Sequence, residues 1–180
     1  IFSAPFRRKQ NKTQVFPLPG SIFVHNRLTH SLEVASVGMS LGDDVARELI
    51  KRHPELAGTL IEEIGTIVST ACLAHDMGNP PFGHSGEAAI SSFFETNPAT
   101  LSSLNEKQKA DLLNFEGNAQ GFRILSRKNS ELNVTANVLA AFTKYPRESQ
   151  VINYKDSSFS ARKDQKKFGF FQSEKDTFIN

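Results

Sequence analysis

The sequence predicts a mainly α-helical protein, and two long apolar patterns support that prediction. Between Leu28 and Leu41, apolar residues return about every 3.6 positions, which is the period of an α-helix. This first pattern consists of Leu28, Leu32, Ala35 and Met39. From Leu56 to Ala74 the same period recurs as a stripe, with Glu62 and Glu63 on the opposite side. We therefore expect an all-α fold built around two amphipathic helices.

Turn-forming residues indicate where these helices end. Gly42 with Asp43 is expected to interrupt the first helix, which then continues over 44–52 as far as Pro54. The second helix should end at Asn79-Pro80-Pro81, because proline lacks the amide hydrogen that a helix needs. A third helix is expected over 86–94, with Ser85 as its N-cap.

The second half of the chain predicts shorter helices and one segment of a different kind. Helices are expected over 107–113, 118–125 and 134–142. Residues 144–167 are polar and rich in Ser, Lys and Asp, so they could form a small β-hairpin, an irregular excursion or a loop. Before the first helix, Phe16-Pro17-Leu18-Pro19-Gly20 favours an extended or turn conformation.

Composition places the chain among soluble globular proteins. With 180 residues, 38% of them hydrophobic, residues 1–180 are expected to form a single domain. The first residue, Ile1, and the lack of a stop signal at 176–180 predict truncation at both ends. The net charge of +2 is too small to indicate a nucleic-acid partner, although Arg7-Arg8-Lys9 and Lys12 form a local basic cluster. The apolar segment 60–74 is too short to span a bilayer, so no membrane partner is expected. The single cysteine, Cys72, fits a reducing compartment, which predicts a cytoplasmic location.

An adjacent His75-Asp76 pair is the strongest chemical signal in the sequence. His84 follows in a turn rich in Gly and Pro, and His30 lies on the first predicted helix, so three of the five histidines fall in two short segments. Imidazole and carboxylate together suit a transition metal better than an all-oxygen site does. If the helices pack together, His30, His75 and Asp76 converge. The alternative is a buried histidine with a hydrogen-bond partner and an aspartate that caps a helix.

Longer blocks around these residues resemble the HD-domain phosphohydrolases, and more narrowly the deoxyguanosine triphosphate triphosphohydrolase (dGTPase) family. The matching segments are 11–16 (NKTQVF), 26–34 (NRLTHSLEV), 75–87 (HDMGNPPFGHSGE), 115–121 (FEGNAQG) and 168–175 (FGFFQSEK). The resemblance implies an HD-domain helical core, a divalent metal ion (Mn, Mg or another transition metal) and hydrolysis of deoxynucleoside triphosphates, with dGTP the first candidate, to deoxynucleoside and inorganic triphosphate. It also implies a homo-oligomer and raises single-stranded nucleic acid or a nucleotide effector as a partner.

The resemblance also assigns expected roles to individual residues. The implied metal ligands are His30, His75 and Asp76, and a fourth, an aspartate, is expected beyond residue 180, because Asp176 follows the last matching block too closely. His84 and Glu87 match the catalytic pair. The implied substrate-binding residues are Gln14, Arg27, Asn79, Glu116 and Asn118, with Arg27 directed to phosphate and Gln14 to the sugar 3′-hydroxyl. Phe115 stands where some relatives carry a histidine, which places the chain in one branch of the family.

Two other functions remain open at this level. One is an HD-type nucleotide phosphatase or phosphodiesterase, which would release orthophosphate rather than triphosphate. The other is a non-catalytic HD module that binds nucleotides or single strands through Arg7, Arg8, Lys9 and Lys12. The presence of His30, His75, Asp76, His84 and Glu87 argues against the non-catalytic module.

Overall fold

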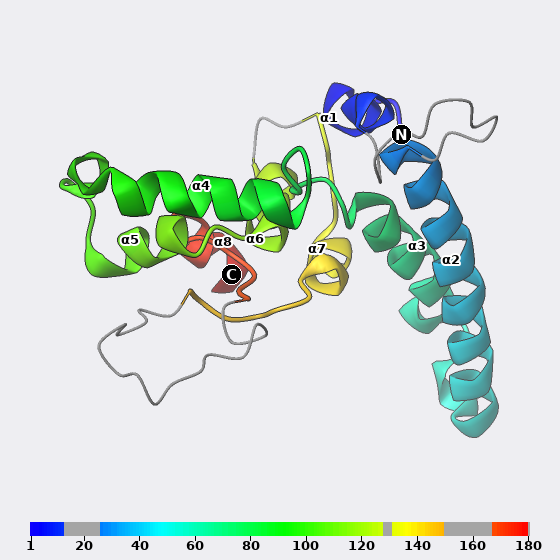
Figure 1. The fold of residues 1–180 in the computed structure, drawn as a ribbon. Helices are drawn as coiled ribbons and strands as arrows, with labels where there is room; N and C mark the ends of the chain where they lie inside the picture. The colour runs from blue at the N-terminus through cyan, green and yellow to red at the C-terminus, as the bar shows by residue number, and fades with distance from the viewer. Residues whose placement is uncertain (13–25, 128–130, 150–166, 180) are drawn as a thin grey trace, which may run out of the picture. The chain divides into compact units, whose positions relative to one another are not determined.

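The computed structural model describes residues 1–12, 26–127, 131–149 and 167–179 (Figure 1). Their contacts divide into two compact units, residues 1–77 with 129–142 and residues 78–128 with 143–180, and each unit is described by itself. The regular structure of the described ranges is helical, with no β-strand, which confirms the all-α prediction. Within the same ranges, no helix is both long enough and apolar enough to cross a membrane.

The first unit consists of one long helix with shorter helices around it. These are α1 (Ala4–Arg7), η1 (Arg8–Asn11), α2 (Arg27–Arg52), η2 (Pro54–Leu56), η3 (Leu60–Glu63), α3 (Ile64–Ala74) and α7 (Ala136–Phe142). α2 packs along α3, and α3 in turn contacts α7. Asn26 and Thr29 form a reciprocal capping box that fixes where α2 begins.

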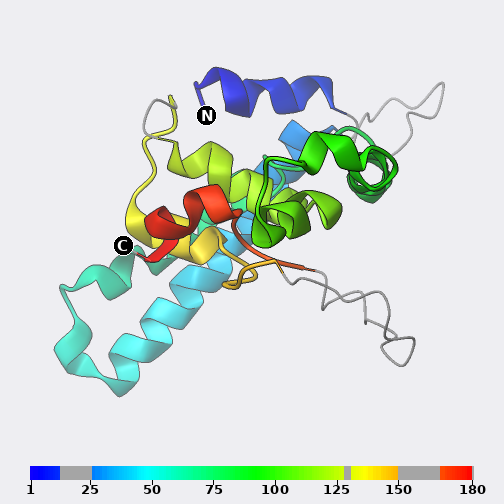
Figure 2. The same cartoon turned by 90° about the vertical axis from the view of Figure 1, so that its left-hand side faces the viewer.

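The predicted interruption of α2 at Gly42 is wrong, because α2 is one continuous helix from Arg27 to Arg52 (Figure 1). Figure 2 shows the C-terminal part of this helix from another side. Gly42 lies against the backbone of Gly65 on α3, and an added Cβ would be 2.7 Å from the Gly65 Cα. The glycine therefore serves close approach of two helices rather than a turn.

The buried face of α2 also differs from the predicted one. The predicted apolar face included Leu32 and Met39, yet each is 44% exposed. The buried residues of this helix are mostly small: Arg27, Ser31, Ala35, Gly38, Gly42 and Ala46. An added Cβ at Gly38 would be 2.8 Å from the Cys72 Sγ, so the two helices are too close for large side chains.

The predicted helix over 56–74 is shorter than expected. α3 begins at Ile64, preceded by a turn at Gly58 (φ +74°) and by η3, which Thr59 caps through its hydroxyl. A left-handed glycine breaks the α-helical hydrogen-bond pattern, and Leu60, predicted on the apolar stripe, is 71% exposed.

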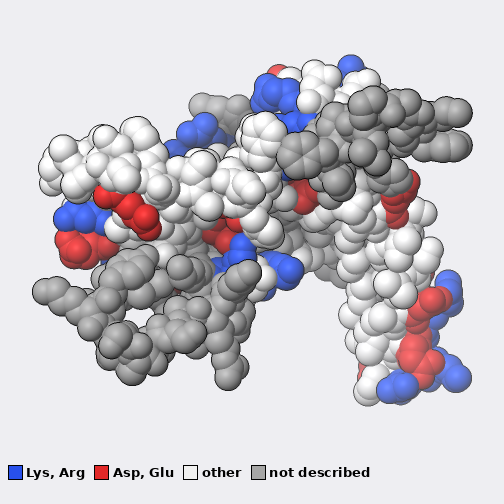
Figure 3. Space-filling view, viewed as in Figure 1, with Lys and Arg blue, Asp and Glu red and all other residues white. Residues whose placement is uncertain are grey.

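The C-terminal part of α2 is charged and exposed. The ion pairs Asp44–Arg47 and Glu48–Arg52 lie there (Figure 3).

The second unit contains the remaining helices. These are α4 (His84–Thr96), η4 (Pro98–Leu101), α5 (Glu106–Leu113), α6 (Gly117–Ser126), η6 (Gln172–Glu174) and α8 (Lys175–Ile179). Each predicted helix is present within one or two residues at its ends, but Ser85 is not an N-cap. α4 begins at His84, and its N-cap is Gly83 with φ +56°, a backbone conformation that glycine adopts without strain.

Phenylalanines fill the core of the second unit. Phe168 and Phe171 pack with Ala119 and are almost fully buried, with Phe115 against them. Phe170 and Phe178 stack with ring centroids 4.3 Å apart. The segment 168–171 therefore anchors α6 and α8 through apolar burial, the main stabilising term in folding.

Buried Asp111 ties three segments of the same unit together. Its carboxylate accepts a hydrogen bond from the Ser149 hydroxyl and one of 2.7 Å from the Gln172 backbone N–H. Burial raises the pKa of Asp111, and the two hydrogen bonds act against that rise. Three earlier predictions lie outside the described residues: the conformation of 16–20, the role of Gln14 and most of the segment 144–167.

Candidate metal and acid–base sites

Three predicted metal ligands converge in the first unit. His30 lies on the first turn of α2, His75 is the C-cap of α3 and Asp76 follows it directly. One donor atom from each lies within 4.8 Å of the others, and the two imidazole rings have centroids 5.1 Å apart. Asp76 is buried, whereas both histidines are half-buried. Two imidazoles and one carboxylate at this spacing could hold one metal ion, and metal binding by these residues stays a prediction.

A backbone hydrogen bond orients His75 for this role. Its Nδ1 lies 2.7 Å from the Cys72 carbonyl oxygen, which can only accept, so Nδ1 carries the hydrogen. Nε2 then keeps its lone pair, and it lies 3.4 Å from Asp76 Oδ1. Ligand histidines commonly donate their second ring N–H to a backbone carbonyl in this way. The arrangement therefore fits a metal donor set.

Positive charge gathers at the same end of α2. Arg27 is the first residue of that helix and is buried, and its backbone N–H donates to the Lys12 carbonyl oxygen. Burial lowers the pKa of Lys12, and the charges of Arg27 and Arg8 lower it further. Burial lowers the pKa of Lys9 to about 8, against the charge of Asp76, which raises it. Several cations this close repel one another, and a bound anion would relieve that repulsion. This end of α2 therefore favours an anion.

His84 and Glu87 form the predicted pair in the second unit. Phe82 (φ +65°) and Gly83 turn the chain so that His84 becomes the first residue of α4. The His84 Nδ1 lies 2.7 Å from Glu87 Oε2, and the histidine side chain is 87% exposed whereas that of Glu87 is 12% exposed. The carboxylate can only accept from Nδ1, so Nδ1 carries the hydrogen of this bond, and Nε2 lies outside the pair on a highly exposed side chain.

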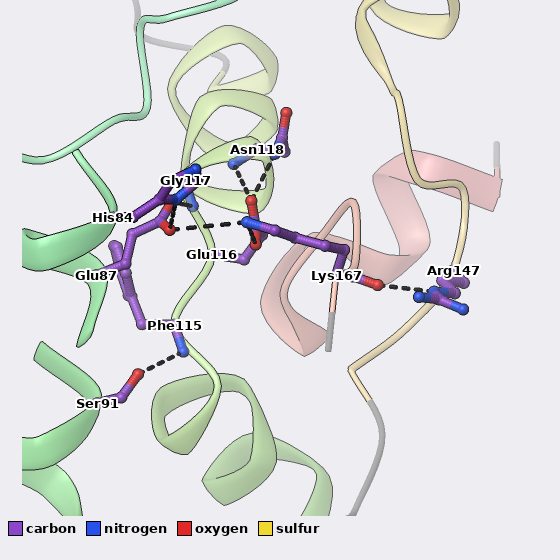
Figure 4. Close-up of polar contacts among 9 residues, drawn as sticks. All are labelled: His84, Glu87, Ser91, Phe115, Glu116, Gly117, Asn118, Arg147 and Lys167. Carbon is purple, nitrogen blue, oxygen red and sulfur yellow. Dashed lines mark hydrogen bonds and ion pairs between the residues drawn. The ribbon is translucent and has the colours of Figure 1, made fainter. Parts of the chain in front are cut away.

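A lysine that the sequence did not indicate extends this pair into a network (Figure 4). The Lys167 Nζ lies 2.6 Å from Glu116 Oε2 and 3.7 Å from Glu87 Oε2. Burial alone would lower the pKa of Lys167, but the hydrogen bond and charge of Glu116, with the charge of Glu87, outweigh it and raise that pKa. The Gly117 N–H donates to Glu87 Oε1 at 2.9 Å, so this carboxylate is held on both oxygens.

The other predicted substrate residues lie around the start of α6. Glu116 is its N-cap and accepts from the Asn118 backbone and side-chain amides. An added Cβ on Gly117 would lie 2.4 Å from Asn79 Oδ1, so Asn79 packs directly against this turn. Four predicted residues, Glu87, Glu116, Asn118 and Asn79, thus lie around one turn of the second unit. Lys167 was missed because it is the last residue of the polar segment 144–167, although the matching block 168–175 begins directly after it.

Residues 27–117 match the family model described as HD domain. The match includes the three candidate metal ligands, the His84–Glu87 pair and Glu116.

Three curated relatives are similar over most of the chain. The chain is 48% identical to the deoxyguanosinetriphosphate triphosphohydrolase-like protein of Synechocystis sp., over 99% of this chain and 42% of that protein. It is 39% identical to the protein of the same name in Listeria monocytogenes, over 99% of this chain and 40% of that protein. It is 38% identical to the deoxyguanosinetriphosphate triphosphohydrolase of Klebsiella pneumoniae, over 82% of this chain and 35% of that protein. The chain thus spans about two fifths of the length of these relatives.

Proposed function

Because the chain belongs to the HD domain family, we propose that it carries the site of a metal-dependent hydrolase of deoxynucleoside triphosphates. dGTP is the first candidate substrate, and the products are the deoxynucleoside and inorganic triphosphate. The observation that supports this most directly is the convergence of His30, His75 and Asp76 within 4.8 Å. The names of the similar proteins support the substrate class.

In this proposal, the first unit binds the metal and the phosphates. His30, His75 and Asp76 hold a divalent ion, Mn, Mg or another transition metal, which when bound supplies a positive centre and an activated water. Arg27 binds a phosphate group, since a guanidinium donates in a fork that matches two phosphate oxygens. The cations Lys9 and Lys12 beside it favour the same anion.

The second unit supplies the proton that the reaction needs. Hydrolysis at the α-phosphorus releases the deoxynucleoside oxygen, which must take up a proton on leaving. We assign that transfer to His84, because Glu87 fixes its Nδ1–H, so that Nε2 can accept a proton from the attacking water and pass it to the leaving oxygen. Glu116, Asn118 and Asn79 contribute to substrate binding beside it. Gln14 keeps its proposed role at the sugar 3′-hydroxyl, although it lies outside the described residues.

We further propose that residues 1–180 form one HD-type domain, since the family match includes residues of both units. A homo-oligomer, a single-stranded nucleic acid or nucleotide effector and a cytoplasmic location are proposals of the same kind. They derive from the family resemblance and from the single cysteine.

Product analysis tests the proposed reaction. The full-length protein is incubated with each deoxynucleoside triphosphate and Mn²⁺ or Mg²⁺, and ion chromatography separates triphosphate from orthophosphate. Triphosphate as the sole phosphorus product is expected, with dGTP turned over fastest. Orthophosphate would instead support a phosphatase, and binding of dGTP without turnover would support a binding module.

Two variants separate the metal centre from the acid–base pair. His84→Ala should lower kcat by about 10²–10⁴-fold and keep its metal, because general acid–base groups typically contribute that much. His75→Ala should lose the metal as well as the activity. Loss of metal from His84→Ala, measured by elemental analysis, would contradict the assigned role, as would near-normal turnover.

A further inference from the structure

Lys9 is a buried lysine that joins two helix ends of the first unit. Its side chain is 2% exposed, and its Nζ lies 5.3 Å from the Phe6 ring centroid. Nζ donates to Ser31 Oγ at 2.5 Å, on α2, and to the Leu73 carbonyl oxygen at 2.9 Å, on α3. Ser31 follows His30 in the chain, and Leu73 precedes His75 by two residues. One ammonium therefore bonds to both helices beside their candidate metal ligands.

Both acceptors of Lys9 have an oxygen lone pair that can take its hydrogen bond. The Ser31 hydroxyl donates its hydrogen to the Arg27 carbonyl oxygen at 2.7 Å, so its oxygen lone pairs face Lys9. The Leu73 carbonyl belongs to the last turn of α3, and the Met77 N–H bonds instead to the carbonyl of Ala74. Carbonyl oxygens at a helix C-terminus lack intrahelical partners and carry partial negative charge, so a cation there is favoured.

We propose that Lys9 is a positioning residue for the candidate metal centre, holding the start of α2 and the end of α3 at the spacing that brings His30 and His75 together. Van der Waals packing of small residues elsewhere along the pair permits close approach but does not select one separation at the ligand end. Two directional, charge-assisted hydrogen bonds from one atom do select it. Only the metal-binding part of this inference rests on the proposed function.

The test compares Lys9→Met with a control variant in the same segment. Lys9→Met keeps a long apolar side chain and removes all three donors, whereas Phe6→Leu loosens the packing of α1 and leaves both hydrogen bonds. Nuclear Overhauser effects between the ring protons of His30 and His75 are measured in EDTA, since the wild-type rings are 5.1 Å apart between centroids. Mn²⁺ affinity is then measured by electron paramagnetic resonance.

We expect Lys9→Met to weaken the ring-to-ring signal and to raise the Mn²⁺ dissociation constant about 10- to 100-fold, the usual effect of losing an outer-shell partner. Phe6→Leu should lower Tm and leave both readouts at wild-type values. Wild-type signal and affinity in Lys9→Met would overturn the inference, as would equal changes in Phe6→Leu. If Lys9→Met does not fold, Ser31→Ala replaces it, because this variant removes one of the two acceptors of Lys9. The ring-to-ring signal and the Mn²⁺ affinity should then change in the same directions by smaller amounts, and wild-type values of both would overturn the inference.

The outcome for Lys9 is separable from the outcome for the metal centre. Wild-type protein that binds Mn²⁺ no better than His75→Ala would contradict the proposed metal site. The ring-to-ring signal in EDTA needs no metal, so it still decides whether Lys9 positions His30 against His75.

Discussion

The Lys9→Met variant also measures the free-energy cost of a buried charge. Burial lowers the pKa of Lys9 from 10.5 to about 8, with the charge of Asp76 acting in the opposite direction. At about 1.36 kcal/mol for each pH unit between the two pKa values, the charged lysine costs the folded state about 3 kcal/mol. Because the folded pKa is the lower one, the unfolded protein binds more protons between pH 8 and 10.5. The free energy of unfolding of the wild type should therefore increase as the pH is raised from 8 to 10.5 and decrease as the pH is lowered over the same range.

Urea unfolding at pH 7 and pH 10, followed by circular dichroism in EDTA, measures this cost. The free energy of unfolding of the wild type, relative to that of Lys9→Met, should be about 2 kcal/mol larger at pH 10 than at pH 7, since pH 10 stops short of the unfolded pKa. Met does not titrate, and the bonds lost to Ser31 and Leu73 are lost at both pH values, so they cancel. A relative stability that stays constant within about 0.5 kcal/mol, or that changes in the opposite direction, would refute the argument.

Three further substitutions test the packing and the second-unit network. Gly42→Ala should lower the free energy of unfolding by about 1 kcal/mol or more despite the helix propensity of alanine, because its Cβ meets the Gly65 backbone; urea titration measures this loss. Asp111→Asn keeps the shape of the side chain but cannot titrate. Because the pKa of Asp111 is raised in the folded state, the folded wild type takes up a proton before the unfolded chain does, and its stability relative to Asp111→Asn should increase as the pH is lowered toward 3.8; urea unfolding at several acidic pH values measures this. Glu116→Gln leaves Lys167 without its closest carboxylate and should cost about 3 kcal/mol, part of which the double variant with Lys167→Met recovers in thermal unfolding.

Much of the fold follows from local sequence signals. The 3.6-residue periods predicted the helices, and the structure contains them, although the break at Gly42 and the start at Leu56 were wrong. These features depend on residues close in sequence, so a pattern can reveal them. The predicted metal ligands also converge, because the two short motifs lie on two helices that pack against each other.

The errors arose where packing between helices outweighs the pattern along one helix. Large apolar residues of α2 suggested the buried face, but α2 and α3 approach so closely that Gly38 and Gly42 lie at the contact, with Leu32 and Met39 exposed. A glycine in a helical pattern predicts a break when it is considered alone. Its opposite role appears only when the partner helix is present, because the space that it leaves is filled by another backbone.

The sequence by itself determined the helical class and pointed to the candidate metal ligands and the His84–Glu87 contact, because these depend on short-range spacing, on side-chain chemistry and on motifs that resemble the family. Only the tertiary structure decided that Lys9 bonds to the ends of α2 and α3 and that Lys167 pairs with Glu116. Both lysines come from segments with mixed polar composition, where a solvated surface position is the ordinary expectation. Their positions are set by acceptors and carboxylates far away in the chain, which no local pattern contains.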